Sequence, residues 1–126
     1  MPGTDANAPV IDTALLAAAA TAELEDWGPL DEATSDSIPM QVHGLTLWAA
    51  GDESGAEAGV WQCTAGPSHW VQEENEVIYV LSGTLTVTPD GGPSKTLAPG
   101  DMAVFPRGWR GAWELHETVR KVYVVF

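Results

Sequence analysis

Residues 100–126, GDMAVFPRGWRGAWELHETVRKVYVVF, decide the fold class of this chain. Pro106 and Gly108 mark a turn, and the two runs that follow, residues 111–117 and 120–126, have the composition of β-strands. The stretch also holds four of the chain's five Lys and Arg residues, although the formal net charge is −13. We therefore expect two adjacent strands whose cations pair with carboxylates or hold a ligand.

The sequence from Gln41 onward consists of short β-rich runs separated by turn-forming residues. The earlier runs are 41–50, 58–65, 68–72, 76–83, 84–89, 95–99 and 102–106, and the breaks are GDESG, AGP, EEN, PDGGP and PGD. Short strands with Gly, Pro and Asp at the breaks are typical of an antiparallel sandwich or barrel. The sequence thus predicts an all-β domain over residues 40–126.

Residues 1–39 differ in composition and are predicted to form an N-terminal extension. Its first residues are small, polar and proline-bearing, which is typical of a loose terminus. Residues 13–26, TALLAAAATAELED, are predicted to form a helix that Asp12 or Thr13 caps and that a Gly-Pro pair ends. An acidic connector over residues 28–40 then leads into the strands.

Composition and charge exclude several classes of function. At 126 residues the chain is long enough for one domain with a core. Eighteen acidic against five basic residues argue against binding to nucleic acid or to anionic membranes, because both need clustered Lys and Arg. No Lys or Arg precedes Lys95, so no signal peptide is expected, and no apolar run reaches membrane-spanning length. With a single cysteine, Cys63, expected to be a buried thiol, the chain is predicted to be a soluble cytoplasmic protein.

Two turn patterns give the chain a family resemblance. EVIYVLSG places Glu76 seven residues before Gly83, and GDMAVFPRG places Gly100 before Pro106 and Gly108. In this order, these patterns resemble the two motifs of the cupin superfamily. The amino-acid sequence of the last segment is similar to that of the ureidoglycine aminohydrolase-type cupin domains. The resemblance implies a small antiparallel jelly-roll barrel over residues 40–126, preceded by the helical extension.

The resemblance also implies where a metal would bind, and there the sequence departs from the family. Metal-binding cupins carry two histidines before the motif glutamate and a third after the second-motif glycine. With a gap of three residues before Glu76, the paired positions hold Trp70 and Gln72. With a gap of four residues they hold His69 and Val71, and the third position holds Gly111 in either case. The remaining candidate ligands for a manganese, zinc, iron or nickel ion are His69, Gln72 and Glu76. Because three or four protein ligands are usual, we expect no metal in the usual site.

Glu76 and Lys121 are the candidate catalytic residues. In cupins this glutamate faces the barrel interior, and Lys121 lies within reach if it faces inward too. A buried carboxylate without a metal must be paired, because an isolated buried charge is too costly. Three roles stay open: a structural ion pair, general acid–base work on a small substrate, or anchoring of a ligand.

Aromatic residues are the candidate lining of a ligand pocket. Such pockets combine apolar walls with a few polar groups. Tyr79 and Phe105 are further aromatics of the barrel, and the alternative is that all of these rings form its core. In the metal-free interpretation, Trp70 fills the space of a metal and Gly111 makes room for its indole. The predicted ligand-binding residues are Trp61, Trp70, Gln72, Trp109, Trp113 and Tyr123.

Three functions are compatible with these residues. The first is a metal-free cupin that binds a small carboxylate- or amide-bearing molecule in its barrel. The second is a metal-dependent aminohydrolase-like enzyme of nitrogen or ureide metabolism, although those relatives carry two cupin domains in one chain. The third is a scaffold that acts through dimer formation, since cupins commonly pair and two-fold dimers are the commonest assembly. A homodimer is expected in each case, and the sequence does not decide whether the protein is an enzyme.

Overall fold

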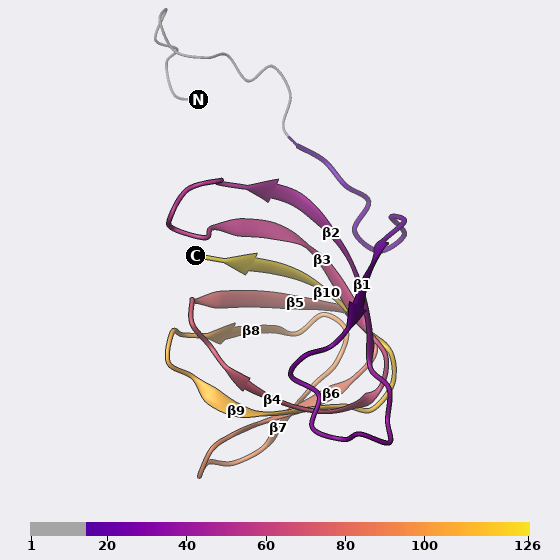
Figure 1. Ribbon diagram of the computed structural model, residues 1–126, viewed down its shortest axis with the longest axis vertical. Helices are drawn as coiled ribbons and strands as arrows, with labels where there is room; N and C mark the ends of the chain where they lie inside the picture. Colours follow the sequence, from indigo (N-terminus) through magenta and orange to yellow (C-terminus); the bar gives the residue numbers. More distant parts are fainter. Residues whose placement is uncertain (1–14) are drawn as a thin grey trace, which may run out of the picture.

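The computed structural model describes residues 15–126, which contain ten β-strands and no helix (Figure 1). No helix in this range is therefore long and apolar enough to cross a membrane. The strands are β1 (Glu25–Pro29), β2 (Gln41–Ala49), β3 (Glu57–Cys63), β4 (Gly66–Val71), β5 (Glu76–Ser82), β6 (Leu85–Pro89), β7 (Lys95–Leu97), β8 (Met102–Phe105), β9 (Arg110–Leu115) and β10 (Val119–Val125).

The strands form two antiparallel sheets that enclose the core. The larger sheet has the order β1-β2-β3-β10-β5-β8, and the smaller has the order β4-β9-β6-β7. Figure 1 shows that the larger sheet curves over the smaller one; from β3 onward the chain alternates between the two sheets, except that β6 and β7 are neighbours in the smaller one. The predicted all-β jelly-roll fold is confirmed, and β10 lies at the centre of the larger sheet between β3 and β5.

Alternation along the strands decides which side chains enter the barrel. Glu76, Ile78 and Val80 of β5 are buried, while Tyr79 between them is exposed. On β10 the buried positions are Val119, Lys121 and Tyr123, in register with the inner face of β5. Because side chains alternate between the two faces of a strand, each inward set was predictable from one known inward residue. The buried apolar core comprises Leu30, Met40, Val42, Val60, Trp61, Cys63, Ile78, Val80, Leu85, Val87, Phe105, Trp113, Leu115, Val119 and Tyr123.

The glycines of the two turn patterns have different physical reasons to be glycine. Gly83 has φ +81° and Gly108 has φ +90°, a region that residues with a Cβ atom rarely adopt. At Gly83 an added Cβ would also lie 2.2 Å from the carbonyl oxygen of Thr118, whereas at Gly108 it would meet nothing within 4 Å. Gly83 is thus required by close backbone packing as well as by its turn, and Gly108 by its turn alone.

The N-terminal extension packs on the barrel as a strand and a turn. The first residues of the helix predicted over 13–26 lie outside the described part of the chain. The described remainder has a turn in which the N–H of Ala22 donates to the carbonyl of Ala18, and it then enters β1, which pairs with β2. Trp27 of β1 occupies the space beside Gly44 that a side chain would fill. Of the range predicted as a helix, residues 15–24 contain this turn and no helix, and residues 25 and 26 belong to β1.

Candidate functional site

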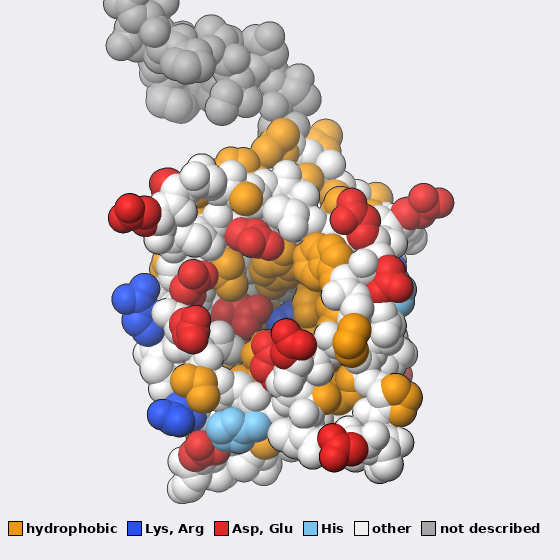
Figure 2. Space-filling model, in the orientation of Figure 1, with side chains coloured by type: hydrophobic (Ala, Val, Ile, Leu, Met, Phe, Trp, Pro, Cys, Tyr) orange, Lys and Arg blue, Asp and Glu red, His pale blue; other side chains and the backbone are white. Residues whose placement is uncertain are grey.

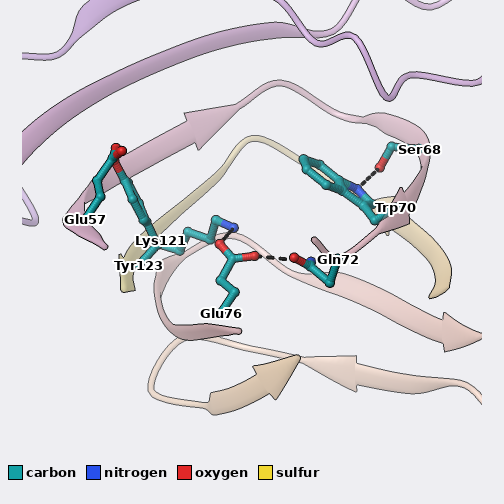
Figure 3. A network of polar contacts seen from close by, with 7 residues as sticks. All are labelled: Glu57, Ser68, Trp70, Gln72, Glu76, Lys121 and Tyr123. Carbon is teal, nitrogen blue, oxygen red and sulfur yellow. Dashed lines mark hydrogen bonds and ion pairs between the residues drawn. The ribbon is translucent and has the colours of Figure 1, made fainter. Parts of the chain in front are cut away.

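One face of the molecule is hollowed (Figure 2). Hydrophobic side chains form part of the wall of the hollow, acidic side chains lie around its rim, and acidic and basic side chains lie at its floor. The polar groups drawn in Figure 3 come from strands that are distant in sequence: Glu76 begins β5, Lys121 lies on β10, and Gln72 directly follows β4. We use the term barrel hollow for the space bounded by Trp70, Gln72, Glu76 and Lys121.

An ion pair lies at the floor of the barrel hollow. The Nζ atom of Lys121 is 3.0 Å from Oε2 of Glu76, and their side chains are only 4% and 10% exposed. The Nε2 atom of Gln72 donates to the other oxygen, Oε1, at 3.3 Å. The predicted pairing of Glu76 with Lys121 is therefore confirmed, and the carboxylate is held from two sides (Figure 3).

The lysine of this pair lies between two indole rings. Its Nζ atom is 4.5 Å from the ring centroid of Trp61 and 4.5 Å from that of Trp113. Trp61 lies directly opposite Lys121 in the pairing of β3 with β10, so the sheet register itself brings these two side chains together. A cation over an aromatic face is stabilised by the ring quadrupole, more strongly when water is excluded. The ammonium is thus stabilised by the Glu76 carboxylate and by both rings.

The tryptophans extend from the core to the barrel hollow. Trp113 is fully buried, and among the described residues its Nε1–H has no hydrogen-bond partner. Trp70 packs on it with ring centroids 4.9 Å apart, and donates its own Nε1–H to Ser68 Oγ at 2.8 Å. Trp113 thus belongs to the core, as the alternative interpretation had it, whereas Trp70 is half-buried and its role as a ligand-binding residue stays a prediction. The side chain nearest to the position of a Cβ atom on Gly111 is the indole of Trp109, while Trp70 is paired with Gly111 across β4 and β9.

A second polar contact, between Tyr123 and Glu57, lies beside the ion pair in Figure 3. The Tyr123 hydroxyl donates to the Glu57 carboxylate, which also accepts a bond from Thr46 Oγ1 at 3.4 Å. Burial, followed by the hydrogen bond to Glu57, raises the pKa of Tyr123 well above its usual value. Glu57 was not among the residues predicted from the sequence, although its spacing of two and four residues from Gly59 and Trp61 places it on the same face of β3.

The mouth of the barrel hollow is acidic. A pocket of about 360 Å³ opens there, lined by Trp70, Val71, Gln72 and Val125 together with the carboxylates of Glu32, Glu73 and Glu74. Val125 is paired with Glu76 across β5 and β10, so this pocket adjoins the ion pair. These three carboxylates come from loops, and the sequence analysis did not single them out.

The candidate metal ligands do not converge. His69 lies on the outer face of β4, exposed, where its Nε2 atom is 3.0 Å from Oδ1 of Asp90. It therefore points away from Gln72 and Glu76, and the set of three predicted as a fallback metal site is not brought together. Within residues 15–126 no three His, Cys, Asp or Glu side chains are arranged to hold a metal ion. The donors that meet in the barrel hollow, one carboxylate and one amide, do not fit the metal centre of metal-binding cupins.

Two predicted residues lie apart from the barrel hollow. Trp109 packs edge-on against Phe105, with centroids 4.9 Å apart, and lines a separate groove of about 520 Å³ at the edge of the two sheets. Cys63 is fully buried, as predicted, and burial raises the pKa of its thiol to about 11. A thiol of this pKa has little thiolate at neutral pH and is not a nucleophile.

The comparison with protein families agrees with this geometry. Residues 50–123, more than half of the chain, match the EutQ-like cupin domain. The chain belongs to the EutQ-like cupin domain family. The resemblance to the cupin superfamily is thereby confirmed, whereas the finer resemblance to ureidoglycine aminohydrolase-type cupins stays a prediction.

Solved structures similar to this EutQ-like cupin domain carry the same fold. A putative ethanolamine utilization protein Q from Salmonella typhimurium LT2 is 25% identical, with a TM-score of 0.62 over 79% of this chain and 76% of that one. A DUF861 family protein of unknown function from Pseudomonas syringae pv. tomato is 24% identical, with a TM-score of 0.75 over 85% of this chain and 46% of that one. This chain thus spans about half the length of the Pseudomonas protein.

A third similar structure is a DUF861 family protein from Thermotoga maritima. It is 34% identical, with a TM-score of 0.52 over 53% of this chain and 76% of that one. Among curated proteins, none matches the chain.

Proposed function

We propose that this single cupin domain binds a small molecule bearing amide or amine N–H groups at the floor of its barrel hollow. The observation that carries the proposal is the Glu76 carboxylate, which is fixed by Lys121 and Gln72 and is still partly open to the hollow. A carboxylate has about four acceptor positions, and the two bonds seen here occupy only part of them. N–H donors of a ligand would occupy the remainder, while the Trp70 ring covers its apolar part.

Charge at the mouth distinguishes between the two ligand classes suggested by the sequence. A carboxylate ligand would have to pass Glu32, Glu73 and Glu74 and then approach Glu76 itself, in a chain of net charge −13. The negative charges of the ligand and of these glutamates would repel each other, most strongly where water is partly excluded. The geometry therefore favours an uncharged amide or an ammonium over a carboxylate.

Catalysis at this site would use the same two residues. Glu76 would act as general base and accept a proton from a ligand N–H or from a bound water. The Lys121 ammonium would stabilise the ionised carboxylate before the proton is accepted and after it is released. The alternative, a metal-dependent aminohydrolase, is less favoured because the histidines that would bind its metal are replaced by Trp70, Gln72 and Gly111.

Glu76→Gln tests the binding proposal. We expect propionamide and ethanolamine to shift amide resonances around Gln72 and Glu76 in two-dimensional NMR, and propionate, the carboxylate of the same size as propionamide, to shift them far less. In Glu76→Gln the affinity for the two N–H donors should fall at least tenfold, because hydrogen bonds to charged groups contribute about 1.5–3 kcal/mol.

The matched control for this test is Glu114→Gln, which changes an exposed glutamate of β9 by the same atoms. It should leave both affinities unchanged. If Glu76→Gln lowers stability but leaves binding intact, Glu76 is only half of a structural ion pair and the proposal is wrong.

We also propose that the protein forms a two-fold homodimer through the outer face of its larger sheet. The strand registers place Val77, Tyr79, Val122 and Val124 together on that face, and we call these residues the outer patch. Tyr79 and Val124 are 45% and 38% exposed. None of the outward side chains of the two strands that form this patch is a carboxylate in a chain with 18 acidic residues, so two copies could meet here without like-charge repulsion.

Tyr79→Glu tests the dimer. Light scattering coupled to size exclusion should give about twice the 13.3 kDa mass of the chain for the unaltered protein and the monomer mass for Tyr79→Glu. Ala112→Glu adds the same charge to the exposed face of the smaller sheet and should leave the mass unchanged. A monomeric unaltered protein, or a dimer that survives Tyr79→Glu, would contradict this interface.

A further inference from the structure

A second hollow lies where the two sheets are open at one edge. β7 is the last strand of the smaller sheet and β8 is the last strand of the larger one. Between them lies a groove of about 520 Å³, within the range of small-molecule sites. We call it the edge groove. Its lining residues are Val87, Pro89, Pro93, Lys95, Leu97, Met102, Ala103, Val104, Phe105 and Trp109.

The edge groove is apolar apart from one cation. Its floor is aromatic, because Phe105 and Trp109 pack edge to face at 77° with ring centroids 4.9 Å apart. Lys95 lies directly opposite the buried Val87 in the pairing of β6 with β7, so its side chain leaves the strand on the inner face, toward the groove. Nine of the ten lining residues are thus apolar, and the tenth carries a positive charge at the rim.

The charge of Lys95 has no partner among the described residues. No carboxylate lines the groove, and Lys95 makes no ion pair or side-chain hydrogen bond within residues 15–126. Two acidic residues adjoin lining residues in the sequence, but both are engaged elsewhere. Asp90 contacts His69 Nε2, and Asp101 accepts the N–H of Ala98 at 2.8 Å.

We propose that the edge groove binds an amphipathic monocarboxylate, with its apolar chain on Phe105 and Trp109 and its carboxylate at Lys95. Burial of the ligand's chain against the apolar lining contributes to the free energy of binding. The unpaired ammonium of Lys95 favours a negatively charged head group. The edge groove, which no carboxylate lines, therefore favours an anion, whereas the carboxylates at the mouth of the barrel hollow disfavour one. This inference does not depend on the function proposed for the barrel hollow.

A competing explanation for Lys95 is protection of an edge. An inward-pointing charge on an edge strand prevents pairing with another sheet, and β7 and β8 both have a free edge. In that case Lys95→Gln would promote self-association and would not affect ligand affinity. A second copy of the chain seated in the groove would likewise exclude the carboxylate.

Calorimetric titration with octanoate tests the proposal on the full chain. We expect saturable binding of octanoate, no detectable binding of acetate, which lacks the chain, and weaker binding of octylammonium, which has the opposite charge. Lys95→Gln should weaken octanoate binding about fivefold, the effect of one partly exposed charge pair. Arg107→Gln removes an exposed cation outside the groove and should leave the affinity unchanged, as should Glu76→Gln at the barrel hollow.

Several results would overturn the proposal. These are the absence of saturable octanoate binding, equal binding of octylammonium, and octanoate affinity that Lys95→Gln does not alter. A loss of octanoate binding in Glu76→Gln with no loss in Lys95→Gln would place the carboxylate in the barrel hollow. Because Lys95 is exposed, Lys95→Gln is expected to fold normally, and the comparison does not depend on a stability change.

Discussion

Replacing Lys121 by methionine is expected to lower the free energy of unfolding by about 3–5 kcal/mol. Methionine keeps the unbranched stem of the lysine but removes the ammonium, so Glu76 would stay buried with only Gln72 as a donor. The loss arises because an unpaired buried carboxylate has given up its hydration without a compensating charge. Urea denaturation at neutral pH, monitored by far-ultraviolet circular dichroism, measures it.

A double-mutant cycle separates the ion pair from the packing of its stems. Glu76→Gln combined with Lys121→Met removes both charges, and we expect it to recover most of the stability lost in Lys121→Met alone, since replacing both partners of a buried pair is often nearly neutral. Lys95→Met, on the exposed part of β7, is the control and should change stability by less than about 0.5 kcal/mol. A loss below about 1 kcal/mol in Lys121→Met would show that the pair is not a stabilising element of the barrel.

This ion pair was predictable because strand alternation is a local property. Once Glu76 is placed inside, a period of two carries Ile78 and Val80 inside with it, and the same rule on the last strand groups Lys121 with Tyr123. Register between the two strands does not need to be known, because a lysine side chain reaches along the sheet. Lys121 is paired with Val80 and still contacts Glu76.

The alternation of side chains along a strand also explains why His69, Gln72 and Glu76 do not form a metal site. His69 and Gln72 are three residues apart on an extended segment, so their side chains point to opposite faces. The two side chains therefore cannot bind one metal ion together with Glu76. Parity along β4, set by the buried Ser68, would have revealed this from the sequence once the strand was located. The spacing to Glu76 alone could not, because the loop after β4 has no fixed period.

What the sequence could not supply depends on contacts between distant segments. Glu32, Glu73 and Glu74 meet at the mouth only because two loops fold toward each other, and loops have no periodic pattern that positions side chains. The separation of Trp109 from the other tryptophans likewise follows from Phe105, which lies between it and Trp113 at 4.9 Å from each ring. The pairing of β1 with β2 and the place of Trp27 beside Gly44 also depend on a contact with a later segment of the chain, which the local sequence of β1 does not indicate.

The second large effect is expected at alkaline pH, where the protein should lose about 2 kcal/mol of stability between pH 9 and pH 11. The Cys63 thiol is fully buried, and burial raises its pKa from the usual 9.0 to about 11, although the nearby Lys121 ammonium partly opposes the shift. Since the folded pKa is the higher one, this contribution is complete well below pH 9 and is lost as the pH rises through 11, with a slope of at most about 1.4 kcal/mol per pH unit. Urea denaturation at closely spaced pH values measures the slope.

Two variants assign this slope to its source. Cys63→Ala lowers stability at every pH by leaving a small cavity, but between pH 9 and pH 10 its free energy of unfolding should be nearly flat. Tyr123, whose pKa is also raised, begins to contribute only above its usual value of 10.0, so Tyr123→Phe should keep the slope below pH 10 and reduce it above. If Cys63→Ala retains the full slope from pH 9, the thiol is not what destabilises the barrel in alkali, because a group that has been removed cannot release a proton on unfolding.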